Sequence, residues 1–134
     1  ACNADGVHIG QDDAAVSEAR RILGPDKIIG VSAHTVDEAR AAEQAGADYL
    51  GVGAVFSTST KLDADIVTLQ TLRGIRAAVS IPIVAIGGIN VENMLQLKGS
   101  GIDGAAVVSA LFAQQDVYAA AKRLYATSKE LVFG

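Results

Sequence analysis

The sequence predicts an α/β fold built on a parallel sheet, and three observations support this. Short apolar segments recur along the 134 residues, each is followed by a stretch with helical features, and each reads as a nearly continuous apolar run. Such runs are typical of strands buried on both faces, as in parallel sheets covered by helices. Half of the residues are hydrophobic, with 14 glycines against 2 prolines, which is typical of a compact chain. We therefore expect one domain over residues 1–134.

Five apolar segments are the expected strands. They lie at residues 5–10, 27–32, 48–53, 81–86 and 103–108, with the sequences DGVHIG, KIIGVS, DYLGVG, IPIVAI and DGAAVV. Because a helical pattern follows each of them, the chain contains five strand–helix units.

The helix after the second strand has the clearest signals. Thr35 can cap its first turn, Glu38 stands three residues later and completes a capping box, and Gly46 ends the helix. The other signals are residues 11–13 opening the first helix, Asn90 capping the fourth, and an amphipathic pattern over residues 116–131.

A short motif repeats before three of the strands. It reads NADGVHI at residues 3–9, GADYLGV at 46–52 and GIDGAAV at 101–107. In the second and third copies a glycine ends a helix and an aspartate leads into the next strand, and the first copy has the same form without a preceding helix. A closed parallel barrel of this kind has eight units and about 250 residues. Five units therefore predict a partial barrel.

Charge and cysteine content exclude several classes of function. The net charge is −4 and no block of basic residues is present, which argues against a nucleic-acid or membrane-surface binder. Cys2 has no second cysteine to pair with, and the sequence has neither a charged leader nor an apolar run of about 18 residues. The expected compartment is the cytoplasm.

The residue types that could carry chemistry follow the strands. In parallel α/β folds the loops at the carboxyl ends of the strands face the ligand. The candidates are Asp12 and Asp13 after the first strand, Ser32 and His34 after the second, residues 57–61 (STSTK) after the third, Gly87 and Gly88 after the fourth, and Val108 and Ser109 after the fifth.

Hydroxyl groups and one cation stand together in the STSTK segment. Thr58, Ser59 and Thr60 can donate hydrogen bonds to anionic oxygens, and Lys61 can neutralise their charge. The alternative is a solvated loop before a helix cap.

Glycines and a serine suggest a phosphate site on the last two strands. Gly87 and Gly88 allow the backbone to approach a ligand closely, and Ser109 stands at a helix start, where amide groups favour an anion. The alternative is tight packing of the turns.

The acidic and histidine candidates have weaker patterns. Asp13 could hold Mg²⁺ together with water and substrate phosphates, or it could simply offset the dipole of the first helix. His8 lies within a strand and is expected to be structural, whereas His34 follows a strand and could cap a helix or transfer a proton.

Several of these motifs, in this order and spacing, resemble thiamine phosphate synthase. They are ADGVHIGQDD, IIGVSAHT, ADYLGVGAVFSTSTKLDA, IPIVAIGGIN and GAAVVSALF, and the resemblance extends from about residue 4 to the last helix. It implies a (βα)₈ TIM barrel and a transferase. The family joins hydroxymethylpyrimidine diphosphate to thiazole phosphate, giving thiamine monophosphate and pyrophosphate, with Mg²⁺ on the diphosphate.

The resemblance also implies roles for individual residues. Asp13 matches the Mg²⁺ ligand, and Ser32 matches a serine near the pyrimidine diphosphate. Thr58, Thr60 and Lys61 match the loop that holds the phosphates, while Gly88, Val108 and Ser109 match the thiazole phosphate cradle. Lys61 and Ser32 are the expected catalytic residues, acting by charge stabilisation and positioning.

The sequence departs from the family in two places. Ser57 stands where the family usually has proline. The first three strand–helix units of the family, which carry a glutamine–arginine–lysine motif and an asparagine–aspartate pair, have no counterpart, so the resemblance covers about the C-terminal three-fifths of the barrel.

Two alternatives to the synthase function stay open at this stage. A related thiazole tautomerase would use His34 to move a proton, although the STSTKLDA loop has the synthase form. A phosphate-binding partial barrel without catalysis is the second.

A partial barrel also predicts association. Five strands with helices on one face leave an inner face, which we expect to carry layers of Val and Ile, and two unpaired sheet edges. We expect the chain to form a homo-oligomer or to pair with an N-terminal segment, and to bind small phosphorylated substrates.

Overall fold

A computed structural model describes residues 2–10, 13–58 and 65–134, without the side chains of residues 13 and 14. All five expected strands are present; β2 is as long as its sequence segment but begins one residue later, and the other four are shorter than expected. They are β1 (Gly6–Ile9), β2 (Ile28–Ala33), β3 (Tyr49–Val52), β4 (Ile83–Ile86) and β5 (Gly104–Ala106). They form one parallel sheet in the order β1-β2-β3-β4-β5, so β1 and β5 are its edges within the described residues.

Helices follow the strands as expected, with one exception. The α-helices are α1 (Asp13–Leu23), α2 (Val36–Gln44), α3 (Leu69–Ala78), α4 (Ser109–Phe112) and α5 (Val117–Phe133). The fourth unit contains instead the 3₁₀-helix η2 (Met94–Leu97). Asn90 caps the turn that leads into η2, because its side chain accepts a hydrogen bond from the Asn93 amide at 3.0 Å.

The signals at α2 are confirmed in most respects. The Thr35 hydroxyl accepts from the Glu38 amide at 3.1 Å, and Gly46 follows the helix with a φ of +101°. The Glu38 carboxylate accepts from the His34 amide rather than from Thr35, so the returning bond of the capping box lies one residue earlier than expected.

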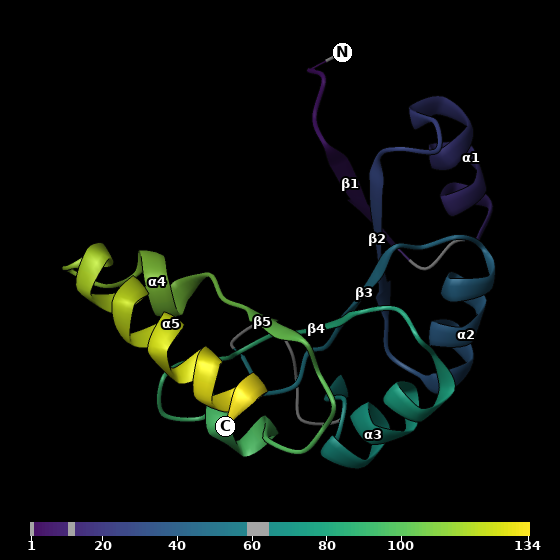
Figure 1. Cartoon of the computed structure of the whole chain (residues 1–134). Helices are drawn as coiled ribbons and strands as arrows, with labels where there is room; N and C mark the ends of the chain where they lie inside the picture. The colour runs from purple at the N-terminus through teal and green to yellow at the C-terminus, as the bar shows by residue number, and fades with distance from the viewer. Residues whose placement is uncertain (1, 11–12, 59–64) are drawn as a thin grey trace.

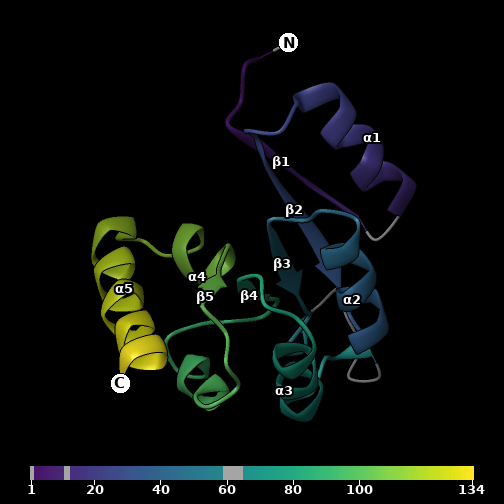
Figure 2. The same ribbon diagram turned by 45° about the vertical axis from the view of Figure 1, so that its right-hand side comes forward.

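One face of the sheet is covered by helices. Figures 1 and 2 show α1, α2 and α3 side by side along this face, while α5 and η2 cover it near β5. The side chains that point toward the helices form the apolar core, and on the strands they are Ile29, Val31, Ala33, Leu50, Val52, Ile83 and Ala85, each at most 1% exposed.

The other face differs from the expected layers of Val and Ile. Strand register places eleven residues on it: Gly6, His8, Ile28, Gly30, Ser32, Tyr49, Gly51, Val84, Ile86, Gly104 and Ala106. Four of these are glycines, and only Ile28, Val84 and Ile86 are branched aliphatic. The expectation of Val and Ile layers on this face was therefore wrong. Side chains alternate along each strand, and most of the bulky aliphatic ones point toward the helices, which leaves mainly small and polar residues on the open face.

Among the described residues, none of the helices is both long enough and apolar enough to span a bilayer.

Candidate functional site

A cavity of about 300 Å³ lies at the carboxyl ends of β2, β3 and β4. Ser32 and His34 line it from the end of β2, and Thr58 reaches it from the segment after β3. The remaining lining residues are Gly51, Gly53, Ala54, Ile86 and Gly87. Because most of them are glycine or alanine, the backbone itself forms much of the wall.

A second cavity of about 300 Å³ adjoins the first at the ends of β4 and β5. Thr58, Ile86 and Gly87 line both cavities, so the two form one continuous groove. The second is completed by Gly88, Ile89, Ala106, Val107, Val108 and Ser109. Ser32, predicted to lie near the diphosphate, and the predicted thiazole phosphate residues Gly88, Val108 and Ser109 therefore line the two ends of one groove.

His8 connects three strands on the open face. Its Nδ1 lies 3.0 Å from the Tyr49 hydroxyl, and its Nε2 lies 2.9 Å from the Ser32 hydroxyl. A side chain at Gly51 would put its Cβ 2.9 Å from the imidazole, and one at Gly30 would overlap the Tyr49 ring. The two glycines therefore make room for His8 and Tyr49, which fix the Ser32 side chain at the groove.

The loops after β3 and β4 are held together by their backbones. The Val55 amide donates to the Ile86 carbonyl at 3.0 Å, and the Phe56 amide donates to the Gly87 carbonyl at 3.1 Å. These bonds bring the start of the STSTK segment, including Thr58, to the shared part of the groove.

Gly87 and Gly88 serve this packing. Their φ values are +102° and +67°, and a Cβ at Gly88 would lie 2.9 Å from the Phe56 carbonyl oxygen. The two glycines thus allow the backbone after β4 to pack closely against the loop after β3, which agrees with the alternative of tight turn packing. The same geometry leaves both glycines on the groove wall, so packing and ligand binding are compatible here.

His34 lies beside Ser32 in the first cavity. Its Nδ1 is 3.4 Å from the Glu38 carboxylate, and its amide donates to the same carboxylate at 2.6 Å. His34 is therefore oriented by the first turn of α2.

Five candidate residues are only partly covered by the structure, or not at all. Asp12, Ser59, Thr60 and Lys61 lie outside the described residues. Asp13 is the first residue of α1, directly after the carboxyl end of β1, but its side chain is outside the description. Ser57 is exposed.

Metal ligands are sparse in the described part of the chain, where no group of three or more His, Cys, Asp or Glu side chains lies close enough to hold an ion. A Mg²⁺ site here would need few protein ligands. That is the usual arrangement for Mg²⁺, which binds one or two carboxylates together with water and substrate phosphates.

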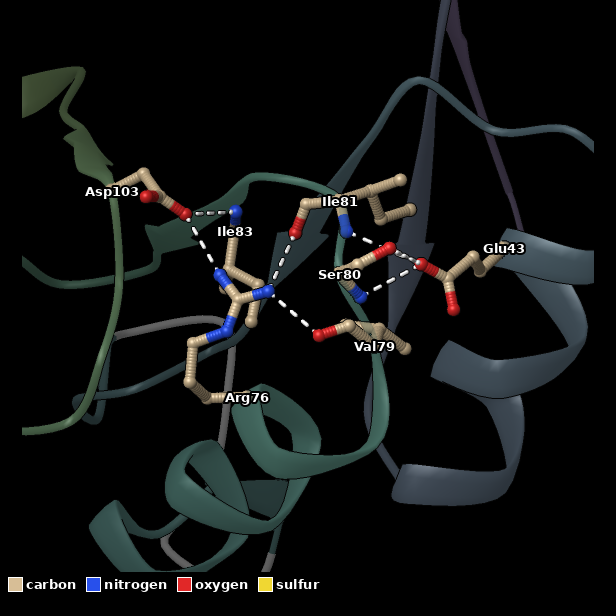
Figure 3. A network of polar contacts seen from close by, with 7 residues as sticks. All are labelled: Glu43, Arg76, Val79, Ser80, Ile81, Ile83 and Asp103. Atoms are coloured by element: carbon tan, nitrogen blue, oxygen red, sulfur yellow. Dashed lines mark hydrogen bonds and ion pairs between the residues drawn. The ribbon is translucent and has the colours of Figure 1, made fainter.

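Two carboxylates with lowered pKa values lie away from this groove. They are Glu43, which is shown in Figure 3, and Asp48. Hydrogen bonds from the Ser80 hydroxyl and amide lower the pKa of Glu43, and those from the Ile29 amide and the Arg20 guanidinium lower the pKa of Asp48. Both carboxylates lie at the amino ends of the strands and join neighbouring elements there. The contacts of these two carboxylates and the groove thus lie at opposite ends of the sheet.

Reasoning from sequence missed the contacts behind Ser32. His8 was expected to be structural and contacts the Ser32 hydroxyl, whereas Tyr49, which contacts the other ring nitrogen of His8, was not considered. The available signal was the strand period: His8, Ser32, Tyr49 and the two glycines Gly30 and Gly51 all fall on one face once the register is known.

Known proteins with similar sequence and structure point to one family. A family profile described as thiamine monophosphate synthase matches residues 1–111. The thiamine-phosphate synthase of Ruminiclostridium cellulolyticum is 56% identical over 124 residues, which are 92% of this chain and 59% of that protein. The thiamine-phosphate synthase of Chloroflexus aurantiacus is 57% identical over 127 residues, 94% of this chain and 58% of that protein.

The structure agrees with the sequence comparison. Thiamine phosphate pyrophosphorylase from Pyrococcus furiosus superposes with a TM-score of 0.85 at 43% identity, over 96% of this chain and 61% of that one. This chain thus spans about three-fifths of the length of the relatives it matches. From the profile, the identity and the shared sheet, the chain belongs to the thiamine monophosphate synthase family.

Proposed function

We propose that this chain forms the carboxyl-terminal part of a thiamine phosphate synthase site, in which hydroxymethylpyrimidine diphosphate and thiazole phosphate are joined to thiamine monophosphate and pyrophosphate. The observation that carries the proposal is the single groove that runs from Ser32 to Ser109. A reaction that joins two phosphorylated substrates needs two anion subsites within reach of one reacting centre, and the groove offers an end for each.

The chemistry requires charge stabilisation rather than a protein nucleophile. The bond between the pyrimidine methylene carbon and the diphosphate oxygen breaks, its electron pair leaves with pyrophosphate, and the thiazole nitrogen supplies the pair for the new carbon–nitrogen bond. Ser32, positioned by His8, donates a hydrogen bond at the diphosphate end. Thr58 contributes a second hydroxyl in the middle of the groove, where the two cavities join.

The same proposal assigns further residues by resemblance. Thr60 and Lys61 hold the departing pyrophosphate, and Gly88, Val108 and Ser109 hold the thiazole phosphate. Asp13 would hold Mg²⁺, which when bound neutralises charge on the diphosphate. The cytoplasm is the proposed compartment.

The test is a synthase assay with both substrates, measuring pyrophosphate release and thiamine monophosphate formation. The chain is assayed alone and with the remainder of the R. cellulolyticum synthase, the part that its match to this chain leaves uncovered. We expect little activity alone and activity in the mixture. Lys61→Ala should lower turnover by about 2–4 kcal/mol of transition-state stabilisation. Unchanged turnover in Lys61→Ala would remove the lysine from the reaction.

Thiazole tautomerisation is the second candidate, because His34 lies in the first cavity beside Ser32. His34→Ala separates the two functions. A synthase should keep most of its turnover in this variant, whereas a tautomerase should lose its isomerisation of thiazole phosphate. Binding of thiazole phosphate with neither reaction would identify a non-catalytic phosphate-binding protein.

A further inference from the structure

Three hydrogen-bonding side chains cross the open face behind the groove. The Tyr49 hydroxyl lies 3.0 Å from Nδ1 of His8, and the Ser32 hydroxyl lies 2.9 Å from Nε2 of the same ring. Of the three, Ser32 alone lines the groove, because His8 and Tyr49 line a separate cavity of about 260 Å³ toward the amino ends of β1, β2 and β3. A hydrogen-bonded effect of Tyr49 on a ligand in the groove therefore passes through His8 and Ser32.

Sheet register and one glycine bring these side chains together. His8, Gly30 and Tyr49 are neighbours on β1, β2 and β3, so His8 and Tyr49 stand on either side of Gly30. Because Gly30 has no side chain, the two rings meet across β2, with their centroids 5.6 Å apart. Ser32 lies two residues further along β2 on the same face, near the carboxyl end where the groove begins. The imidazole thus lies between the two hydroxyl groups.

The two hydroxyl groups have opposite roles toward a neutral imidazole, since one ring nitrogen donates a hydrogen and the other accepts one. In the first arrangement Nε2 donates to the Ser32 oxygen and the Tyr49 hydroxyl donates to Nδ1. The Ser32 hydrogen then stays available to a ligand in the groove. In the second arrangement Nδ1 donates to Tyr49, and Ser32 uses its hydrogen on Nε2, so it can only accept from a ligand. The tautomer of His8 thus decides which ligand groups Ser32 can bind.

Tyr49 favours the first arrangement. A phenol is a stronger donor and a weaker acceptor than the aliphatic hydroxyl of serine, because its ring withdraws electron density from the oxygen. Among the described residues, His8 is also the only hydrogen-bond partner of the Tyr49 hydroxyl, so in the second arrangement the Tyr49 hydrogen would have no acceptor there. An anionic oxygen in the groove adds to the preference, since it binds a donor.

We propose that Tyr49 is a positioning residue, which holds His8 in its Nε2–H tautomer so that Ser32 presents its hydroxyl hydrogen to an anionic phosphate oxygen in the groove. This inference rests on the proposed function, because that function supplies the diphosphate at this end of the groove. It adds that Ser32 selects an acceptor group of the ligand, and that a residue outside the groove sets this selectivity.

Nitrogen-15 NMR of the imidazole rings tests the tautomer directly. The chain has two histidines, and His34→Ala assigns their signals by removing one set. At alkaline pH we expect His8 to show a protonated Nε2 and an unprotonated Nδ1. Tyr49→Phe keeps the ring but removes the donor, so the Nδ1–H form should become populated and the chemical shifts of the two nitrogens should approach each other. Ser32→Ala should leave the Nε2–H form dominant, because Tyr49 sets it.

Turnover in the synthase assay, with the remainder of the R. cellulolyticum synthase added, tests whether the tautomer matters for the reaction. Tyr49→Phe should lower turnover about tenfold with little change in KM, because the Ser32 donor is needed most where charge develops on the leaving diphosphate. Adding Tyr49→Phe to Ser32→Ala should cause no further loss, since Tyr49 acts through Ser32. A purely structural role of Tyr49 would lower turnover by the same factor with and without Ser32.

The control is Tyr118→Phe, which removes the hydroxyl of an exposed tyrosine on α5 and should change neither the imidazole chemical shifts nor turnover. An Nδ1–H tautomer in the parent, chemical shifts that Tyr49→Phe leaves unchanged, or equal losses of turnover with and without Ser32 would each overturn the proposal. Absence of thiamine monophosphate formation by the parent mixture would instead overturn the proposed function, and the chemical shifts would still decide whether Tyr49 sets the tautomer.

Discussion

The two faces of the sheet differ although the same strands build both. Toward the helices, β2, β3 and β4 contribute buried aliphatic side chains, and Ile29, Leu50 and Ile83 are fully buried. Toward the open face, the alternate positions hold glycines and the hydrogen-bonded set of His8, Ser32 and Tyr49. Because successive side chains of a strand point to opposite faces, the same strands form the apolar core on one face and the candidate site on the other.

Deleting a side chain on the helix-covered face should have the largest effect on stability. Leu50→Ala leaves a cavity in the core and should lower the free energy of unfolding by about 2–5 kcal/mol, measured by urea denaturation. Ile86→Ala is the matched change on the open face, where Ile86 is 42% exposed, and should cost less than about 1 kcal/mol. Equal losses in the two variants would contradict the division between the faces.

A glycine of the groove should show an intermediate effect. Gly88→Ala forces a φ of +67° on an L residue and crowds the Phe56 carbonyl, so we expect a loss of about 1–2 kcal/mol in unfolding free energy. It should also weaken binding of thiazole phosphate, measured by calorimetry. Gly104→Ala is the control, since a Cβ there meets no atom within 4 Å, and it should keep both stability and binding.

The contacts of Asp48 with Arg20 and with the Ile29 amide predict a dependence of stability on pH. The pKa of Asp48 is lowered in the folded chain, so the carboxylate contributes stability above its unfolded pKa of about 4, and this is lost as pH falls through the lower folded value. Because the Asp48 side chain is 47% exposed, we expect a contribution of only about 1 kcal/mol. Asp48→Asn should flatten the loss of stability below pH 4 in denaturation curves, and a slope identical to that of the parent would exclude this role.

Ser32 should give the smallest change in stability together with a clear change in function. Ser32→Ala removes one partly exposed hydrogen bond to His8, which should cost about 0.5–1 kcal/mol of unfolding free energy. In the complemented synthase assay it should lower turnover more than it raises the KM for either substrate. If the loss of turnover in Ser32→Ala were explained entirely by unfolding of the variant, Ser32 would have a structural role and no role in the reaction.

Much of the fold could be predicted because its signals are local. The five apolar segments, the cap at Thr35 and the helix end at Gly46 each depend on residues within one or two turns, and the structure confirms them. The fourth helix could not be predicted in the same way. Asn90 does cap the turn, but only a 3₁₀-helix follows, and Met94 and Leu97 are held by packing in the core beside α5.

The sequence by itself determined the family, the parallel sheet and the end of the sheet where the groove lies, because strand, turn and motif residues are read along the chain. Tertiary structure decided what meets across strands: that His8 joins Ser32 to Tyr49, and that the glycines after β4 pack against the loop after β3. It also decided that Asp48 and Asp103 accept hydrogen bonds from Arg20 and Arg76, each on a helix distant in the sequence. These contacts depend on register between segments distant in the sequence, and a shift of one residue would turn each of these side chains to the other face.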